Sequence, residues 1–163
     1  MEQKLSKNQQ FFIVTLRVLI GWHLLYEGVA KLYNPSWTAK GYLLSAEGPF
    51  GAIFYYMAKS DFLLQLIDVV NVWGLMLAGL ALILGLFDKY AAILGALLIF
   101  SYYLAHPPLV GTESVPGEGN VIFVNKNLIE AVALGLLSVF PSGHIIGLNR
   151  FIVWRRKKMV LDN

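Results

Sequence analysis

Residues 11–33 read FFIVTLRVLIGWHLLYEGVAKLY, an apolar run interrupted by a few charged or titratable side chains. A helix that crosses a bilayer needs about 20 consecutive, mainly apolar residues. The run ends at Asn34-Pro35, a pair that stops helices. Residues 11–33 therefore predict a transmembrane helix that carries polar groups, and this helix decides the class of the fold.

The composition of the chain also indicates a membrane protein. Of its 163 residues, 57% are hydrophobic and 14% are charged, whereas a soluble domain carries about 25% charged residues. The net charge is only +3, and the basic residues collect towards the chain ends. This pattern favours a lipid bilayer as partner and argues against nucleic acid. The sequence contains no cysteine, which excludes a disulfide, a thiol nucleophile or an iron–sulfur cluster held by its own thiolates.

Three further apolar segments predict three more spans, at residues 68–87, 90–105 and 127–140. The last two are shorter than 20 residues, and we keep them as spans by extending their ends. The short turn at Asp88-Lys89 makes the second and third helices antiparallel neighbours. We therefore expect a single domain over residues 1–163, an all-α integral membrane protein built as a four-helix transmembrane bundle.

The basic residues predict the orientation of this bundle. Lysine and arginine accumulate in short cytoplasmic segments, and one side of the predicted bundle collects Lys4, Lys7, Lys89, Arg150 and the run at 155–158. Both termini should therefore be cytoplasmic, in the inner membrane of a bacterium or archaeon. The outer loops are then residues 34–67, whose many aromatic side chains predict short helices at the interface or capping the bundle, and residues 106–126.

Arg17, His23, Glu27 and Lys31 lie on one face of the first predicted helix. At about 100° per residue they fall within an arc of roughly 120°. A charged side chain at mid-membrane costs roughly 2.5–3.5 kcal/mol, so this face must point into the bundle or towards water. Glu27 and Lys31 can neutralise each other at i and i+4. Arg17 lies nearer the cytoplasmic end, where we expect a structural role with the guanidinium reaching the interface.

The other predicted helices bring polar groups to the same outer half of the bundle. These groups are Asp68 and Asn71 in the second segment, Tyr102 and His106 in the third, and Lys126, Asn127 and Glu130 at the start of the fourth. The sequence thus predicts one polar cluster that faces the periplasmic side. Such a cluster either locks the helices together or forms a functional site, because intramembrane ionisable groups usually mark pathways and sites. We favour a site for the cluster as a whole.

The chemistry of the cluster favours a small, partly apolar substrate. His23 and His106 sit at different depths, which argues against a haem, and the Glu-x-x-His motifs of a di-iron site are missing from the sequence. No ligand spacing supports zinc, so we expect no metal. A quinone, in contrast, needs hydrogen-bond partners for two oxygens and a nearby proton carrier, which His, Glu and Tyr supply.

Several short stretches are similar to a known family. They are Arg17-x-x-x-Gly21, Glu27-Gly28-x-x-Lys31-Leu32, Asn34-Pro35-x-Trp37, Gly48-Pro49-Phe50, the tail VNKNLIE at 124–130, Pro141-Ser142-Gly143 and Gly147-Leu148. In these the chain resembles the DoxX family, and most closely its DoxD-like branch, the small membrane subunit of thiosulfate:quinone oxidoreductase. The resemblance implies a four-helix membrane bundle and electron transfer from a sulfur compound to the quinone pool. After Leu148 the pattern leads us to expect Asp, where this chain has Asn149.

We therefore predict the membrane subunit of a quinone-linked oxidoreductase, with a quinone as its cofactor. Glu27, His23 and His106 are the predicted catalytic proton carriers. The predicted substrate-binding residues are Lys31 and Lys126 for an anion such as thiosulfate, Tyr102, Asn127 and Glu130 for the acceptor, and Asp68 and Asn71 beside them. The aromatic first loop would form a lid. Two alternatives stay open: a non-catalytic scaffold or assembly partner for a soluble redox enzyme, and a small-solute transporter. A second subunit or a homo-oligomer is compatible with each.

Overall fold

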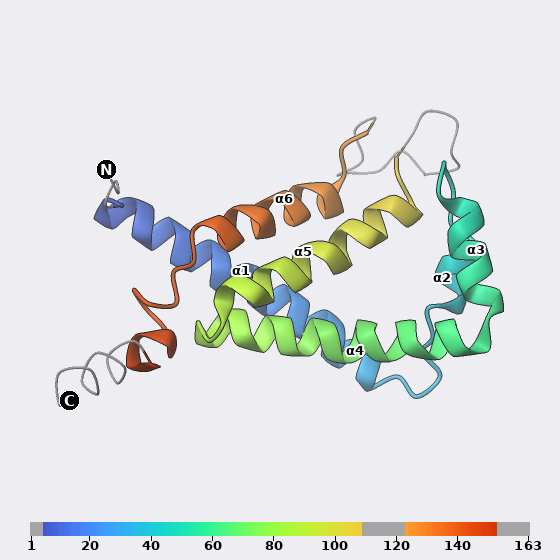
Figure 1. Ribbon diagram of the computed structural model, residues 1–163, viewed down its shortest axis with the longest axis horizontal. Coiled ribbons are helices and arrows are strands. Elements are labelled where there is room, and N and C mark those ends of the chain that lie inside the picture. The colour runs from blue at the N-terminus through green and yellow to red at the C-terminus, as the bar shows by residue number, and fades with distance from the viewer. Residues whose placement is uncertain (1–4, 109–122, 153–163) are drawn as a thin grey trace, which may run out of the picture.

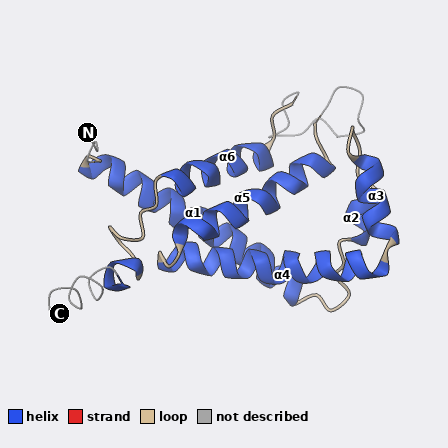
Figure 2. Cartoon of the chain, in the orientation of Figure 1, coloured by secondary structure: helices blue, strands red, loops and turns tan. Residues whose placement is uncertain are grey.

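The computed structural model describes residues 5–108 and 123–152. The secondary-structure elements of this part of the chain are all α-helices (Figure 2). The elements are α1 (Lys7–Leu32), α2 (Lys40–Leu44), α3 (Gly51–Lys59), α4 (Asp61–Leu84), α5 (Asp88–Ala105) and α6 (Lys126–Val139). The long helices pack along one another, and α2 and α3 lie at one end of α4 (Figure 1). We call this end the cap end, and the opposite end, where α1 begins and α6 finishes, the terminal end.

The helix ends follow from local capping. Ser6 caps α1 in a capping box, in which its side chain accepts a hydrogen bond from the Gln9 backbone and the Gln9 side chain accepts one in return. Ser60 caps α4 by accepting from the Leu63 backbone. For this reason α4 begins at Asp61 and not near Asp68, and residues 61–67 belong to the helix and not to the outer loop. Gly85 ends α4 in the left-handed conformation with φ 61°.

The membrane class of the fold is supported by three helices. Among the described residues, α1, α4 and α5 are long and apolar enough to cross a bilayer. Large apolar side chains such as Phe12 and Trp22 are about two-thirds exposed, as expected where lipid covers them. α6 has 14 residues, roughly 21 Å at 1.5 Å per residue, against a hydrocarbon core of about 30 Å. The all-helical membrane fold is thus supported, whereas the fourth span at 127–140 is not confirmed.

Glycines bring α1 and α4 into the closest contact of the bundle. A Cβ atom at Gly79 would lie 2.4 Å from the Leu25 backbone nitrogen, and one at Gly28 would lie 2.9 Å from that of Met76. Gly21 meets the same face of α4. Small residues let helices approach closely in lipid, and here they recur seven apart in α1, a spacing that differs from the four-residue pairs usual for such contacts.

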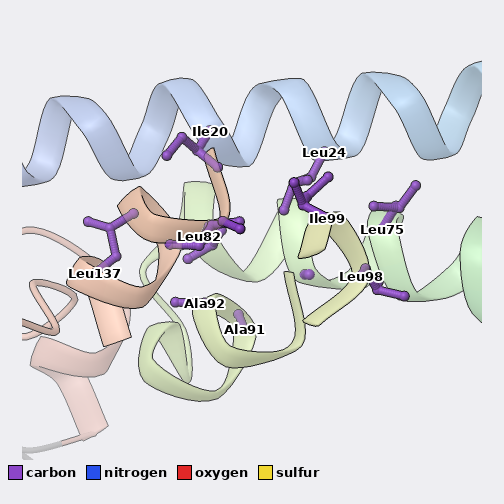
Figure 3. Packing of buried hydrophobic residues seen from close by; sticks show 12 residues of the cluster. Ile20, Leu24, Leu75, Leu82, Ala91, Ala92, Leu98, Ile99 and Leu137 are labelled. Atoms are coloured by element: carbon purple, nitrogen blue, oxygen red, sulfur yellow. The ribbon is translucent and has the colours of Figure 1, made fainter. Parts of the chain in front are cut away.

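The apolar core lies in the middle of the bundle, where α1, α4, α5 and α6 meet. Figure 3 shows Ile20 and Leu24 of α1 pointing towards Leu82, Leu75 and Ile99. Leu24, Leu75 and Leu82 are completely buried. α4 and α5 are antiparallel neighbours joined at residues 85–87, as the short turn predicted. The core separates the terminal end from the cap end.

The terminal end is held by three buried polar side chains, Arg17, Asp88 and Ser142, and the partly buried Asn149. We call these four residues the terminal lock. Asp88 is 3% exposed, and its carboxylate accepts hydrogen bonds from the backbone nitrogens of Ser142 and Gly143, each at 2.7 Å. Asn149 donates to the same carboxylate at 2.9 Å. The lock therefore ties the chain after α6 to the first turn of α5.

Arg17 completes the terminal lock from α1. Its guanidinium donates to the Ser142 hydroxyl at 3.1 Å and to the Ile146 carbonyl at 2.6 Å, and it lies 3.8 Å from the Asp88 carboxylate. The residue is 2% exposed, so the prediction that its guanidinium reaches the interface is wrong. Gly85 is required beside it, because a Cβ there would lie 2.9 Å from the guanidinium. Most of the predicted second outer loop, at residues 109–122, lies outside the described residues. The basic run at 155–158 also lies outside them.

Candidate functional site

A cavity of about 590 Å³ lies at the cap end. Its walls come from α1, α4 and α5 and from the start of α6, and the segment from Trp37 to Leu43 together with α3 covers it. Small-molecule pockets span roughly 300–1,000 Å³. The cavity, which we call the cap cavity, is therefore large enough for a small organic ligand, and its lining is mainly apolar with a few polar side chains.

Glu27 and Lys31 form an ion pair on the α1 side of the cap cavity. The Lys31 ammonium donates to the Glu27 carboxylate at 2.9 Å. The same ammonium lies 5.7 Å from the centroid of the Trp37 ring and 6.0 Å from that of Tyr102, at the outer range of a cation–π contact. Lys31 therefore lies among one carboxylate and two rings. Because an ammonium has three N–H donors, Lys31 can also donate to a ligand in the cavity.

His23 and Glu130 form a second pair, and His23 lies one turn before Glu27 in α1. The Nδ1 atom of His23 lies 2.7 Å from a carboxylate oxygen of Glu130 on α6. The Glu130 side chain is 13% exposed and the His23 side chain 43%. A carboxylate on one ring nitrogen fixes the orientation of the imidazole and leaves the other nitrogen free to exchange a proton.

Tyr102 and Asn71 join α5 to α4 across the cavity. The Tyr102 hydroxyl donates to the Asn71 side-chain oxygen, and the Asn71 amide donates to the Ile67 carbonyl at 3.0 Å. Both residues line the cap cavity. The phenolic oxygen can still accept a hydrogen bond and the amide carries a second hydrogen, so this pair presents both an acceptor and a donor.

The cover of the cavity is fastened by polar contacts. The Tyr42 hydroxyl donates to the Tyr102 carbonyl at 3.0 Å, and the His106 ring contacts the Tyr42 carbonyl at 3.0 Å and packs against the Tyr42 ring. Asp68 accepts a hydrogen bond from the Ala39 backbone at 2.8 Å. Burial raises the pKa of the Tyr42 hydroxyl to about 12, so it remains a donor at neutral pH.

A family model matches the part of the chain that contains most of the cavity lining. The DoxX model matches residues 12–107, which is more than half of the chain. The chain belongs to the DoxX family. The DoxX match runs from α1 to the end of α5, so α6 and the tail stretches, with the lock residues Ser142 and Asn149, lie beyond it. No curated protein and no solved structure matches the chain, and nothing in the comparisons selects the DoxD-like branch.

In this DoxX protein most of the predicted site residues meet around one cavity. His23, Glu27, Lys31, Asn71, Tyr102, Lys126 and Asn127 all line it. Glu130 reaches it through His23. His106 and Asp68 are not among the lining residues, and the contacts described above make them supports of the cover.

Other lining residues carried weaker signals in the sequence. Trp37, Tyr42 and Phe54 belong to the aromatic first loop that predicted a lid, and all three line the cavity. Met57 of the same loop also lines the cavity, and so does Ser101, which stands in the predicted span at 90–105. The described residues contain no cluster of three or more His, Asp or Glu side chains able to hold a metal ion.

Proposed function

We propose that this DoxX protein is the membrane subunit of a quinone-linked oxidoreductase of the thiosulfate:quinone type, and that the cap cavity binds the quinone headgroup. One observation carries the proposal. An apolar cavity of about 590 Å³ collects hydrogen-bonding side chains from α1, α4, α5 and α6. A quinone ring has two apolar faces and two carbonyl oxygens that accept hydrogen bonds. Its shape and polarity therefore fit such a lining.

The carbonyl oxygens of the quinone would be bound by donors on different helices. Lys31 of α1 and Asn127 of α6 both line the cavity, as does the Asn71 amide, which keeps one hydrogen beyond its bond to Ile67. Trp37 and Tyr42 would close over the ring from the cover. Burial in this apolar site strengthens each of these hydrogen bonds relative to water.

Reduction of a quinone to a quinol takes two electrons and two protons. His23 and Glu27 are one turn apart on α1 and both line the cavity, so they are the proposed proton carriers. Glu130, 2.7 Å from the His23 ring, orients the imidazole. His106, which contacts the Tyr42 carbonyl, is assigned to holding the cover.

The electrons would come from a small sulfur anion or from a second subunit that oxidises it. Lys31 and Lys126 line the same cavity and would attract an anion such as thiosulfate. Because the sequence has no cysteine, no thiolate of this chain takes part in the transfer.

We further propose that α6 is a short fourth span and that both termini are cytoplasmic. The basic run at 155–158 supports this orientation. Since the sequence has no cysteine, single cysteines can report it. A thiol reagent that does not cross membranes should label Lys59→Cys at the cap end from outside intact cells and should leave Lys89→Cys unlabelled. The opposite labelling would reverse the orientation.

Quinone extraction combined with native mass spectrometry tests the proposed function. The wild-type protein in mild detergent should carry a quinone, and Glu27→Gln should lose most of it. Asp61→Asn changes an exposed carboxylate outside the cavity and should retain the quinone. A wild-type protein without quinone but with a tightly held protein partner would contradict the proposal and favour the scaffold.

A further inference from the structure

One wall of the cap cavity has no role in binding a headgroup. The polar lining described above comes from α1, α6, Tyr102 and Asn71, whereas Leu66 and Val70 of α4 and Leu98 of α5 contribute only apolar surface. Leu66 and Val70 are one turn apart on α4, so they form a continuous strip along it. We call these three side chains the apolar rim.

The apolar rim is partly open to the surroundings of the protein. Leu66 is 51% exposed and Val70 is 40% exposed although both line the cavity. Leu75, further along the same helix, also lines the cavity and is completely buried. The cavity thus has a closed floor near Leu75, whereas Leu66 and Val70 both line the cavity and reach the outer surface of α4.

The arrangement of α4 and α5 explains the opening. The two helices meet at their connecting turn and diverge towards the cap end (Figure 1). Gly74 and Leu98 mark a point of close approach, since a Cβ at Gly74 would lie 3.1 Å from Leu98. Val70 lies one turn beyond Gly74 towards the cap, at the side where the helices separate.

The depth of the opening places it beside lipid. Val70 lies roughly 14 Å along α4 from Asp61, at 1.5 Å per residue, whereas the whole helix of 24 residues spans roughly 36 Å. α4 is long and apolar enough to cross a bilayer, and with α4 centred on a hydrocarbon core of about 30 Å the apolar rim would lie within that core. An opening at this depth is reached from the acyl chains and not from water.

We propose that the cap cavity takes its ligand laterally from the bilayer between α4 and α5, and that the ligand is a quinone with a long apolar chain lying over Leu66, Val70 and Leu98. This inference rests on the proposed function, since the ring occupies the headgroup site described above. The polar groups hold the ring, and the chain leaves through the apolar rim into lipid. Such a ligand remains in the membrane phase throughout binding and release.

The test compares two probes, a quinone with a long isoprenoid chain and the same ring without a chain. Val70→Trp should narrow the apolar rim and weaken binding of the long-chain quinone by about tenfold or more. The affinity for the ring alone should stay within about twofold of wild type, because the headgroup site is untouched. The matched control is Leu77→Trp, an exposed position of the same helix that does not line the cavity, and it should change neither affinity.

Each other outcome has a distinct meaning. Equal weakening of both probes by Val70→Trp, or no effect on either, would overturn the lateral passage. Leu66→Trp blocks the same rim and serves as the second variant if Val70→Trp does not fold. A phospholipid retained by the wild-type protein, with both quinones bound equally well, would assign the rim to a lipid chain and also overturn the inference. A wild-type protein that binds neither probe would contradict the proposed function itself.

Discussion

The charged side chains at the two ends of the bundle lie in opposite environments. At the terminal end, Arg17 and Asp88 are almost completely buried, and the Asp88 carboxylate accepts three hydrogen bonds from the chain after α6. At the cap end, His23 and Glu27 are close to half exposed and line a cavity. The first arrangement leaves a ligand no room, whereas the second leaves hydrogen-bonding capacity facing an open volume.

This difference separates a structural role from a functional one. Both groups include residues from the same face of α1, yet a buried ion pair tied into a hydrogen-bond network acts on folding. Charged groups around a cavity act on what enters it. The comparison predicts that substitutions in the terminal lock change stability and spare binding, and that substitutions around the cap cavity do the reverse.

Asp88→Ala should have the largest effect on stability. It removes the acceptor of two backbone N–H groups and leaves the buried guanidinium of Arg17 without its carboxylate. Breaking a buried ion pair by removing one partner costs about 3–5 kcal/mol. Thermal unfolding in mild detergent should show this loss, and Asp61→Ala, an exposed carboxylate in the first turn of α4, should cost less than about 1 kcal/mol. A similar loss of stability for both variants would show that the terminal lock does not stabilise the fold.

Gly79→Ala should have the next largest effect, because Gly79 lies where α4 packs most closely against α1. A Cβ there would lie 2.4 Å from the Leu25 backbone nitrogen and 2.6 Å from the Gly21 carbonyl, and overpacking of this kind costs about 1–3 kcal/mol. Gly135→Ala is the matched control in α6, since a Cβ there meets nothing within 4 Å. Equal unfolding temperatures for the two variants would show that α1 and α4 are not held by this contact.

The sequence alone predicted the cap end better than the terminal end. The 3.6-residue period of α1 placed His23, Glu27 and Lys31 on one face. The alternating direction of the helices placed Tyr102 and Lys126 in the same layer. All five residues line the cap cavity. The aromatic content of residues 34–67 predicted short helices there, and α2 and α3 lie within this segment. These features follow from periodicity and composition, which are local properties of the chain.

The terminal lock depends on contacts that are distant in the sequence and was not predicted. Asp88 read as a turn residue, because nothing near it indicates the Ser142 and Gly143 backbone groups that surround it. Asn149, where the family resemblance led us to expect Asp, donates to Asp88 and accepts from the Phe87 backbone. An aspartate could not donate in this way at neutral pH, so the asparagine fits the lock of this chain.

The smallest predicted effect concerns the cover of the cap cavity at high pH. The pKa of Tyr42 is raised from its ordinary value of 10.0 to about 12, so the unfolded chain loses this proton before the folded protein does. The stability contributed by the protonated form is present below about pH 10 and is lost as the pH rises towards about 12. Unfolding temperatures of the wild type should therefore fall more steeply over this range than those of Tyr42→Phe. Parallel curves would show that the pKa of the Tyr42 hydroxyl is not raised in the folded protein.

The most direct test of the comparison removes one hydroxyl from each end and measures both stability and quinone affinity. Ser142→Ala deletes the hydroxyl that accepts from Arg17 and should lower the free energy of unfolding by about 1–3 kcal/mol with the quinone affinity unchanged. Tyr102→Phe deletes the hydroxyl that bonds Asn71 in the cavity wall and should weaken quinone binding by about tenfold, with a stability loss of at most about 1 kcal/mol. If Ser142→Ala weakened quinone binding as much as Tyr102→Phe, or if Tyr102→Phe left it unchanged, the assignment of a lock to one end and a site to the other would be contradicted.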